Sequence, residues 1–224
     1  FEQFLPFAQS LAEESGQLIL SHYLDPHLQV ECKVDGTPVT RADRDAENLM
    51  RKRIESKYPG HGIIGEEGGA LNEDAEFTWL LDPIDGTKSF IAGVPLFGTL
   101  ICLKHLGKPI LGLIHQPVLK QMMIGNGSKT ILNGNEVKVR NHYDLKGSTL
   151  LSTDENDARH RFGDEKWSEL TSKVATYRTW GDCYGYLLLA SSRADAMIDP
   201  IVESWDFHVM IPIVEGAGGI ITDH

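Results

Sequence analysis

Residues 77–90 have the sequence Phe-Thr-Trp-Leu-Leu-Asp-Pro-Ile-Asp-Gly-Thr-Lys-Ser-Phe. The apolar run that opens this stretch predicts a buried strand, which delivers two carboxylates, Asp82 and Asp85, onto a turn. Clustered carboxylates supply the hard oxygen ligands that Mg²⁺ prefers. If a helix begins at Gly86 and Thr87, its free backbone N–H groups form a cradle for an anion. The stretch therefore predicts divalent cations held beside a phosphate group.

The composition is that of a globular chain with an excess of acidic residues. The chain has 224 residues, 41% of them hydrophobic, enough for one large domain or two small ones with a sizeable core. Its formal net charge of −11 argues against nucleic-acid or anionic-membrane partners, which favour basic surfaces. An acidic protein that binds a phosphate ester needs cations in its site, because the two would otherwise repel. No apolar run approaches the length of a membrane span, so we expect a cytoplasmic protein.

Helix and strand patterns interleave along the chain and predict a layered α/β or α+β fold rather than a purely parallel sheet. A capping box at Thr40 and Asp43 predicts a helix that runs to Pro59. Glycine and asparagine turn signals predict a loop over residues 125–134. Further helices are predicted over residues 3–20, 182–191 and 206–214, and strands over 62–65, 77–81, 96–104, 109–115, 148–152, 174–179, 194–198 and 219–222.

Each acidic candidate also has a structural explanation. By spacing alone, Asp82 and Asp85 fit a solvated proline turn nearly as well, but the apolar strand before them favours partly buried carboxylates, which need partners. A solvated loop is the usual explanation of a pair such as Glu66 and Glu67. This pair ends an apolar strand and precedes two glycines, so one of the two is a candidate third oxygen ligand. Asp206 precedes an apolar helical run and fits an N-cap, which does not exclude metal ligation.

A rival phosphatase motif fits poorly. One large superfamily uses Asp-x-Asp-Gly-Thr after an apolar strand, with the first aspartate as nucleophile and the second as general acid. Here Pro83 and Ile84 separate the two aspartates, and the extra residue points the second carboxylate elsewhere. The sequence contains no Walker loop, HExxH motif, Cys-x₅-Arg loop or GxSxG motif.

Taken together, the motifs resemble the inositol monophosphatase family. They occur in the family's order and approximate spacing, and the resemblance covers nearly the whole chain. It implies a layered αβαβα sandwich, usually dimeric, and a Mg²⁺-dependent, lithium-sensitive phosphatase that acts on small phosphate monoesters. The motifs that carry it are Val39–Asp43, Gly65–Glu67, Trp79–Thr87, Trp205–Asp206 and Glu215–Gly219.

By position, the resemblance implies two or three Mg²⁺ ions in each site. Glu66 and Asp82, with the carbonyl group of Ile84, hold the first ion. Asp82, Asp85 and Asp206 hold the second, and Glu66 also reaches a weaker third ion.

The resemblance also implies how the phosphate and the water are held. Gly86 and Thr87 present N–H groups to the phosphate. Thr87, paired with Asp43, orients and deprotonates a metal-activated water, with Glu66 as the third catalytic residue, and Lys33 lies near the phosphate. We expect one catalytic unit over residues 1–224, with most metal ligands in its N-terminal half (1–144) and the substrate-selecting residues and Asp206 in its C-terminal half (145–224).

The segment from Arg178 to Asp182 resembles the histidinol-phosphatase branch of the family, which also carries an Asp-Pro pair like the one at Asp199. Two carboxylates at the edge of the site suit a cationic substrate. Histidinol phosphate carries an ammonium group and an imidazole, whereas inositol carries no positive charge. Arg178 and Glu203 are further candidates for substrate contact. The structural alternatives are an N-cap for Asp182 and a strand-end turn for Asp199.

The leading hypothesis is a histidinol-phosphate phosphatase of histidine biosynthesis that forms a homodimer. An inositol or broad-range sugar-phosphate monophosphatase is the alternative with the same chemistry, and a non-enzymatic regulatory partner that keeps the fold is the alternative of another class. The intact set of acidic motif residues argues against lost catalysis. Residues 215–219 depart from the family's commoner Glu-Ala-Gly-Gly run. The chain stops at His224, where relatives usually continue for a few strands, so we expect a short C-terminal sheet or missing residues.

Overall fold

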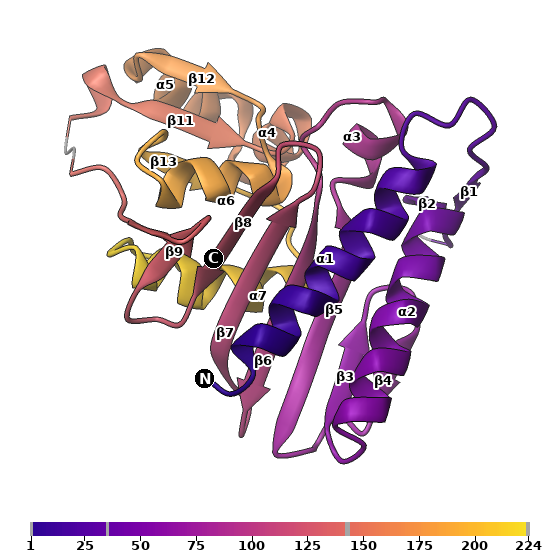
Figure 1. Cartoon of the computed structure of the whole chain (residues 1–224). Helices are drawn as coiled ribbons and strands as arrows, with labels where there is room; N and C mark the ends of the chain where they lie inside the picture. Colours follow the sequence, from indigo (N-terminus) through magenta and orange to yellow (C-terminus); the bar gives the residue numbers. More distant parts are fainter. Residues whose placement is uncertain (1, 35, 142–143, 223–224) are drawn as a thin grey trace.

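The computed structural model describes residues 2–34, 36–141 and 144–222, and these residues form alternating layers of helix and sheet (Figure 1). A helix pair, a large sheet, a second helix pair, a small sheet and a third helix pair follow one another. The arrangement confirms the layered αβαβα fold predicted from the sequence.

The first layer is the helix pair α1 (Leu5–His22) and α2 (Arg41–Lys57), which packs on one face of the large sheet. Helix α2 begins at the predicted capping box, where Asp43 Oδ2 accepts the Thr40 N–H at 2.8 Å. The buried positions of α2 recur at helical spacing, which directs one face of the helix toward the sheet. That face buries two carboxylates along with its apolar side chains: Ala42, Asp43, Ala46, Glu47, Met50 and Ile54.

The large sheet has the strand order β10-β9-β8-β7-β6-β5-β3-β4, in which β3 and β5 are parallel and the other pairs antiparallel. Strand β5 is buried along nearly its whole length because helices cover both faces of the sheet. The strands are β3 (Gly62–Gly65), β4 (Gly69–Leu71), β5 (Phe77–Asp85), β6 (Gly98–His105), β7 (Lys108–Gln116), β8 (Gln121–Gly125), β9 (Thr130–Leu132) and β10 (Asn135–Val137).

Two local predictions on this sheet are wrong in part. Strand β5 continues past residue 81 to Asp85, because Asp82 and Asp85 still pair with β6 on either side of an irregularity. The predicted loop over residues 125–134 contains strand β9. Asn126 Oδ1 accepts two N–H groups of a tight turn, and the chain then returns antiparallel to β8.

The second half of the chain adds three layers. Helices α6 (Asp182–Ala190) and α7 (Ser204–Gly216) cover the other face of the large sheet. The small parallel sheet has the order β12-β11-β13 and lies against α6, with α4 and α5 packed together beyond it. Its elements are β11 (Thr149–Ser152), α4 (Glu155–Phe162), α5 (Asp164–Lys173), β12 (Thr176–Arg178) and β13 (Ala196–Ile198).

The predicted strand over residues 219–222 is wrong. After α7 the chain turns back, with the Gly218 and Gly219 N–H groups bonded to carbonyl groups of the helix, and residues 219–222 pair with no strand of the described chain. The remaining elements are the hairpin β1 (Val30–Cys32) and β2 (Pro38–Thr40), the short helix α3 (Thr87–Ile91) and a 3₁₀ turn at Leu145–Gly147. None of the helices described is both long and apolar enough to cross a bilayer.

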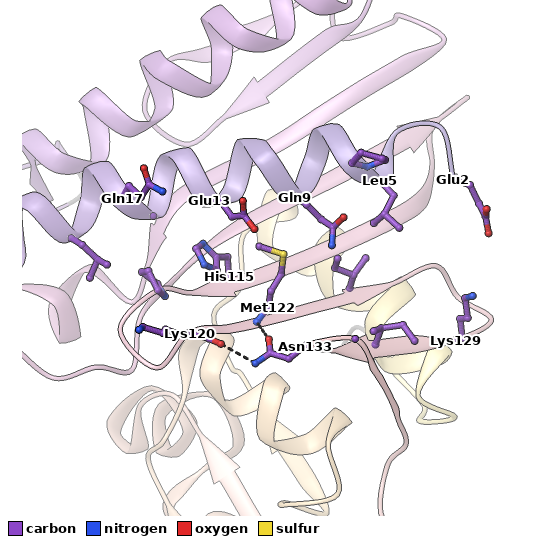
Figure 2. Close-up of a pocket in the computed structure, with 17 residues that line it drawn as sticks. Glu2, Leu5, Gln9, Glu13, Gln17, His115, Lys120, Met122, Lys129 and Asn133 are labelled. Carbon is purple, nitrogen blue, oxygen red and sulfur yellow. Dashed lines mark hydrogen bonds between the residues drawn. The ribbon is translucent and has the colours of Figure 1, made fainter.

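A groove of about 730 Å³ lies between α1 and strands β7 to β9 (Figure 2). Gln9 and Glu13 of α1 face Met122 and Asn133 across it, and His115 lines it from β7. The His115 Nδ1 atom lies 2.8 Å from the Ala12 carbonyl oxygen and ties this edge of α1 to the sheet. The predicted site residues do not line this groove in the described chain, so the groove is separate from the site described next.

Candidate active site

The site forms where β3 and β5 end. Because the two strands are parallel neighbours, their carboxyl ends meet at one edge of the large sheet. Glu66 follows β3, and its N–H donates to the Leu81 carbonyl at 3.2 Å, which places Glu66 beside Asp82. The register of β5 against β6 shifts between Asp82 and Asp85. Asp82 Oδ1 accepts the Ile84 N–H at 2.9 Å and fixes this irregular segment.

Three carboxylates from two distant parts of the chain converge at this edge. Asp206, in the first turn of α7, joins Asp82 and Asp85, and one oxygen from each lies within 4.8 Å of the others. Asp206 Oδ1 is buried and has no hydrogen-bond partner among the described residues. A partnerless buried oxygen in an all-carboxylate group is suited to a hard divalent cation such as Mg²⁺. The N-cap of α7 is Glu203, so Asp206 is not the cap that we considered.

Burial and mutual repulsion raise the pKa values of these carboxyl groups. Burial is the largest cause for all three, and the neighbouring carboxylates add to it. The pKa of Asp206 rises to about 8, and the pKa values of Asp82 and Asp85 rise well above the usual range. A bound cation would offset the repulsion, so the residues present fit a divalent metal.

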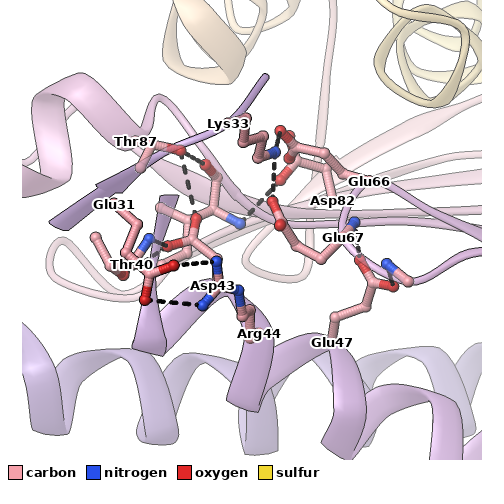
Figure 3. Close-up of polar contacts among 12 residues, drawn as sticks. Glu31, Lys33, Thr40, Asp43, Arg44, Glu47, Glu66, Glu67, Asp82 and Thr87 are labelled. Atoms are coloured by element: carbon pink, nitrogen blue, oxygen red, sulfur yellow. Dashed lines mark hydrogen bonds and ion pairs between the residues drawn. The ribbon is translucent and has the colours of Figure 1, made fainter. Parts of the chain in front are cut away.

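Glu66 lies next to the group but is engaged by an ammonium. Lys33, which follows β1, places its Nζ 2.6 Å from Glu66 Oε1 and 2.5 Å from Glu67 Oε1 (Figure 3). Burial alone would lower the pKa of Lys33, but its hydrogen bonds to the two glutamates raise it overall. The structure therefore brings Glu66, Glu67 and Lys33 together as a charged cluster beside Asp82.

Thr87 and Asp43 meet as predicted. Thr87 Oγ1 lies 2.9 Å from the Ile84 carbonyl oxygen and 3.4 Å from Asp43 Oδ1. The Thr40 hydroxyl and N–H hold the other oxygen of Asp43 at 2.5 and 2.8 Å (Figure 3). Burial raises the pKa of Asp43, and these bonds oppose the rise. Asp43 is therefore held in place as a hydrogen-bond acceptor for the Thr87 hydroxyl.

Gly86 connects the acidic edge to α6. Its φ of 86° favours glycine, and a Cβ here would lie 3.0 Å from the Leu96 carbonyl oxygen and 3.1 Å from Asp182 Oδ2. Asp182 itself has a φ of 50° at the start of α6. The N-cap of α6 is Gly181, so Asp182 is not the N-cap that we considered. Burial raises the pKa of Asp182 to about 6, against the opposing charge of Lys88.

Asp199 lies farther out, between β13 and α7. It lines a cavity of about 530 Å³ together with Tyr186 and Phe207. Burial raises the pKa of Asp199 to about 7, a hydrogen bond with Thr153 opposes the rise, and the charge of Asp182 adds to it. Asp182 and Asp199 are therefore two half-buried carboxylates beside the three converging aspartates, and the charge of Asp182 acts on Asp199.

Arg178 and Glu203 have weaker connections to the site. Arg178 is exposed, donates to the Tyr177 carbonyl at 2.6 Å and lies 5.9 Å from the centre of the Trp180 ring. The Glu203 side chain is exposed, and its backbone carbonyl accepts the Asp206 N–H at 3.1 Å. Among the described residues, Glu203 thus contacts the site residue Asp206 through its backbone and not through its side chain.

Sequence reasoning missed three residues that hold the site. The Cys183 N–H donates to Asp85 Oδ2, and the Thr99 hydroxyl donates to the Pro83 carbonyl at 2.9 Å. Glu47 accepts N–H groups from the turn after Glu66. Glu47 alone had a local signal: it lies one helical turn after Asp43, at a position where the apolar pattern of α2 requires burial.

Comparison with known proteins places the whole chain in one family. A family model described as "Inositol monophosphatase family" matches residues 1–224. A histidinol-phosphatase from Chlorobaculum parvum is 40% identical over 221 residues, which cover 98% of this chain and 85% of that protein. The bifunctional phosphatase IMPL2, chloroplastic, from Arabidopsis thaliana is 43% identical over 99% of this chain, which spans 64% of that protein's length.

Structure comparison gives the same result. A solved structure of an inositol monophosphatase from Zymomonas mobilis superposes with a TM-score of 0.84 at 36% sequence identity. The match covers all of this chain and 86% of the other. The fold and a large part of the sequence are therefore shared with proteins of this group.

Proposed function

The chain belongs to the inositol monophosphatase family of phosphatases, and we propose that it is a Mg²⁺-dependent enzyme that hydrolyses histidinol phosphate to histidinol and phosphate. The observation that supports catalysis is the convergence of Asp82, Asp85 and Asp206 within 4.8 Å. Asp82 is buried and the other two are half-buried, and like charges this close and largely out of water are unfavourable for folding unless a cation joins them. Their presence together indicates a site kept for metal chemistry.

The proposed metal ligands follow the positions of the motif. Glu66, Asp82 and the Ile84 carbonyl would hold one Mg²⁺, and Asp82, Asp85 and Asp206 a second, with Glu66 also near a weaker third ion. When bound, Mg²⁺ would supply Lewis-acid stabilisation of the charge that develops on the phosphoryl group and its oxygens.

The protein's own groups then bind the phosphate and direct the water. The Gly86 and Thr87 N–H groups, at the start of α3, would donate to the phosphate oxygens. The Thr87 hydroxyl has two acceptors in reach, the Ile84 carbonyl and Asp43. With that carbonyl used as a ligand, the Thr87 hydroxyl would donate its proton to Asp43 and its oxygen would take a proton from the attacking water. The water oxygen bonds to phosphorus as the ester P–O bond breaks. The departing oxygen takes a proton from solvent and leaves as the alcohol, and Asp43 later returns its proton to solvent.

The substrate assignment rests on Asp182 and Asp199. Asp182 Oδ2 lies beside Gly86, at the end of the proposed phosphate cradle, and Asp199 is close enough for the charge of Asp182 to raise its pKa. A substrate with positive charges would pair with these half-buried carboxylates, and histidinol phosphate carries an ammonium group and an imidazole. The name of the Chlorobaculum relative, histidinol-phosphatase, agrees with this choice. Arg178 and Glu203, whose side chains are both exposed, are weaker candidates for contact with the same substrate.

An inositol or sugar-phosphate monophosphatase is the second candidate. It is favoured by the likeness to the Zymomonas inositol monophosphatase over the whole chain. The metal site would be the same for both candidates. They differ only in the side chains that would face the alcohol part of the substrate. Homodimer formation, lithium sensitivity and a cytoplasmic location stay predictions.

Parallel assays separate the two candidates. The purified protein is given histidinol phosphate, inositol 1-phosphate and p-nitrophenyl phosphate, each with Mg²⁺ and with a chelator. Two charge pairs with the half-buried Asp182 and Asp199 should favour histidinol phosphate in kcat/KM by roughly a hundredfold or more. Comparable values for histidinol phosphate and inositol 1-phosphate would contradict the histidinol assignment, and full activity in chelator would contradict the metal mechanism.

A further inference from the structure

Helix α2 buries a second carboxylate, Glu47, one turn after Asp43. Only 2% of Glu47 is exposed. Its Oε2 accepts the Glu67 N–H at 2.7 Å, and its Oε1 accepts the Gly68 N–H at 2.8 Å (Figure 3). The Arg51 Nε–H also donates to Oε1, at 2.7 Å. Glu47 therefore bonds to two successive N–H groups of the turn that begins at Glu66.

The turn is shaped to receive this carboxylate. A Cβ added at Gly65 would collide with Glu47 Oε1, and one at Gly68 would lie 2.8 Å from the same atom. Two glycines thus leave the space in which Glu47 approaches the backbone. Arg51 closes the far side, because its guanidinium donates both to Glu47 and to the Gly69 carbonyl.

These bonds fix the backbone on both sides of Glu66. The Glu66 N–H is held by the Leu81 carbonyl at 3.2 Å, and the next N–H, of Glu67, is held by Glu47. A buried carboxylate with three donors, one of them cationic, is strongly constrained. Gly68 is exposed, so water could satisfy its N–H group without any buried charge, and the residues after it pair with β3 as strand β4. The buried carboxylate of Glu47 therefore acts chiefly by fixing the backbone at Glu66.

We propose that Glu47, supported by Arg51, is the positioning residue for the metal ligand Glu66. It fixes the turn so that the Glu66 carboxylate is presented toward a cation beside Asp82. Asp43 and Glu47 are neighbours along one face of α2, so a single rigid helix sets both the partner of Thr87 and the direction of Glu66. This inference rests on the proposed metal-dependent function.

The test measures metal binding directly, by titrating the protein with Mn²⁺ and following free Mn²⁺ by electron paramagnetic resonance. Glu47→Gln keeps the shape but offers one acceptor oxygen, so Mn²⁺ affinity should fall about 10- to 100-fold, as for other partners that orient ligands. The matched control is Glu55→Gln, an exposed glutamate of the same helix, which should bind Mn²⁺ as the wild type does. With p-nitrophenyl phosphate, the half-saturating Mg²⁺ concentration should rise by a similar factor, while turnover at saturating Mg²⁺ stays within about threefold.

A double-mutant comparison shows whether Glu47 acts through Glu66. In a Glu66→Gln background, adding Glu47→Gln should change Mn²⁺ affinity by less than about twofold, because the ligand that Glu47 positions is gone. Unchanged Mn²⁺ affinity in Glu47→Gln, or full additivity with Glu66→Gln, would overturn the inference. If Glu47→Gln does not fold, Gly68→Ala disturbs the same contact from the exposed side and must give the same weakening. A wild type that binds no Mn²⁺ would instead overturn the proposed function itself.

Discussion

The backbone N–H of Cys183 donates to the carboxylate of Asp85, a contact between residues 98 positions apart in the chain. It joins the first turn of α6 to the end of β5. Asp182, the preceding residue, is thereby held with its carboxylate beside Gly86. The part of the site proposed to select the substrate is therefore attached directly to the part proposed to bind metal.

Replacing Asp85 tests the metal role at this junction. Asp85→Asn keeps an oxygen that can accept the Cys183 N–H but removes a charged ligand. Loss of several kcal/mol of transition-state stabilisation should lower kcat/KM by roughly a thousandfold or more, with the fold intact by circular dichroism. Asp164→Asn, which alters an exposed ion pair, serves as the control and should retain full activity. Near-normal turnover in Asp85→Asn would refute the ligand assignment.

Asp182 tests substrate selection. Asparagine is the appropriate replacement, because it tolerates the positive φ of this position better than alanine. Loss of one charge pair should raise KM for histidinol phosphate by about tenfold or more and leave p-nitrophenyl phosphate nearly unaffected. Equal losses on both substrates would show that Asp182 has a structural role only.

Thr87 tests the handling of the attacking water. Thr87→Val removes the hydroxyl at nearly constant volume and should lower kcat by about 10²- to 10⁴-fold. Thr87→Ser keeps the hydroxyl near Asp43 and should retain activity within about tenfold of the wild type. Similar kcat values for the valine and serine variants would show that the hydroxyl does not take part.

The acidic site predicts how the stability of the metal-free protein depends on pH. The pKa of Asp206 is raised from its ordinary value of 3.8 to about 8, so the folded state binds more protons than the unfolded state between these values. The stability that Asp206 contributes is fully present below its ordinary pKa of 3.8, and it is lost as the pH rises through the folded pKa of about 8. Asp182, at about 6, and Asp199, at about 7, act in the same direction.

Thermal unfolding in chelator should therefore give a lower Tm at pH 8 than at pH 6. Saturating Mg²⁺ at pH 8 should restore the Tm, because a ligand that binds only the folded state stabilises it. Asp206→Asn, which cannot titrate in this range, should flatten the pH dependence. A metal-free Tm that rises between pH 6 and pH 8 would contradict this account of the site.

The features that were predicted correctly are those encoded by short stretches of sequence. The capping box at Thr40 and Asp43 determines the start of α2 because both partners lie within one helical turn. The apolar run before Asp82 determines a buried strand in the same way. Once β3 and β5 are parallel neighbours, Glu66 and Asp82 must lie together.

What the sequence did not reveal depends on contacts between distant segments. Nothing local at Cys183 indicates that its N–H meets Asp85, because that contact exists only when α6 packs on the large sheet. The spacing along α2 marks Glu47 as a buried position, but its partners become known only when the turn after Glu66 is in place. The strand predicted over residues 219–222 fails for a related reason, since apolar residues form a strand only where a neighbouring strand can pair with them.

If Asp82, Asp85 and Asp206 converge to hold cations, a crystal grown with Mn²⁺ and measured at an anomalous-scattering wavelength will locate the metal among them. We expect an anomalous peak at bonding distance from oxygens of all three carboxylates. An active protein whose Mn²⁺ peaks lie elsewhere, with these three carboxylates free of metal, would contradict this expectation.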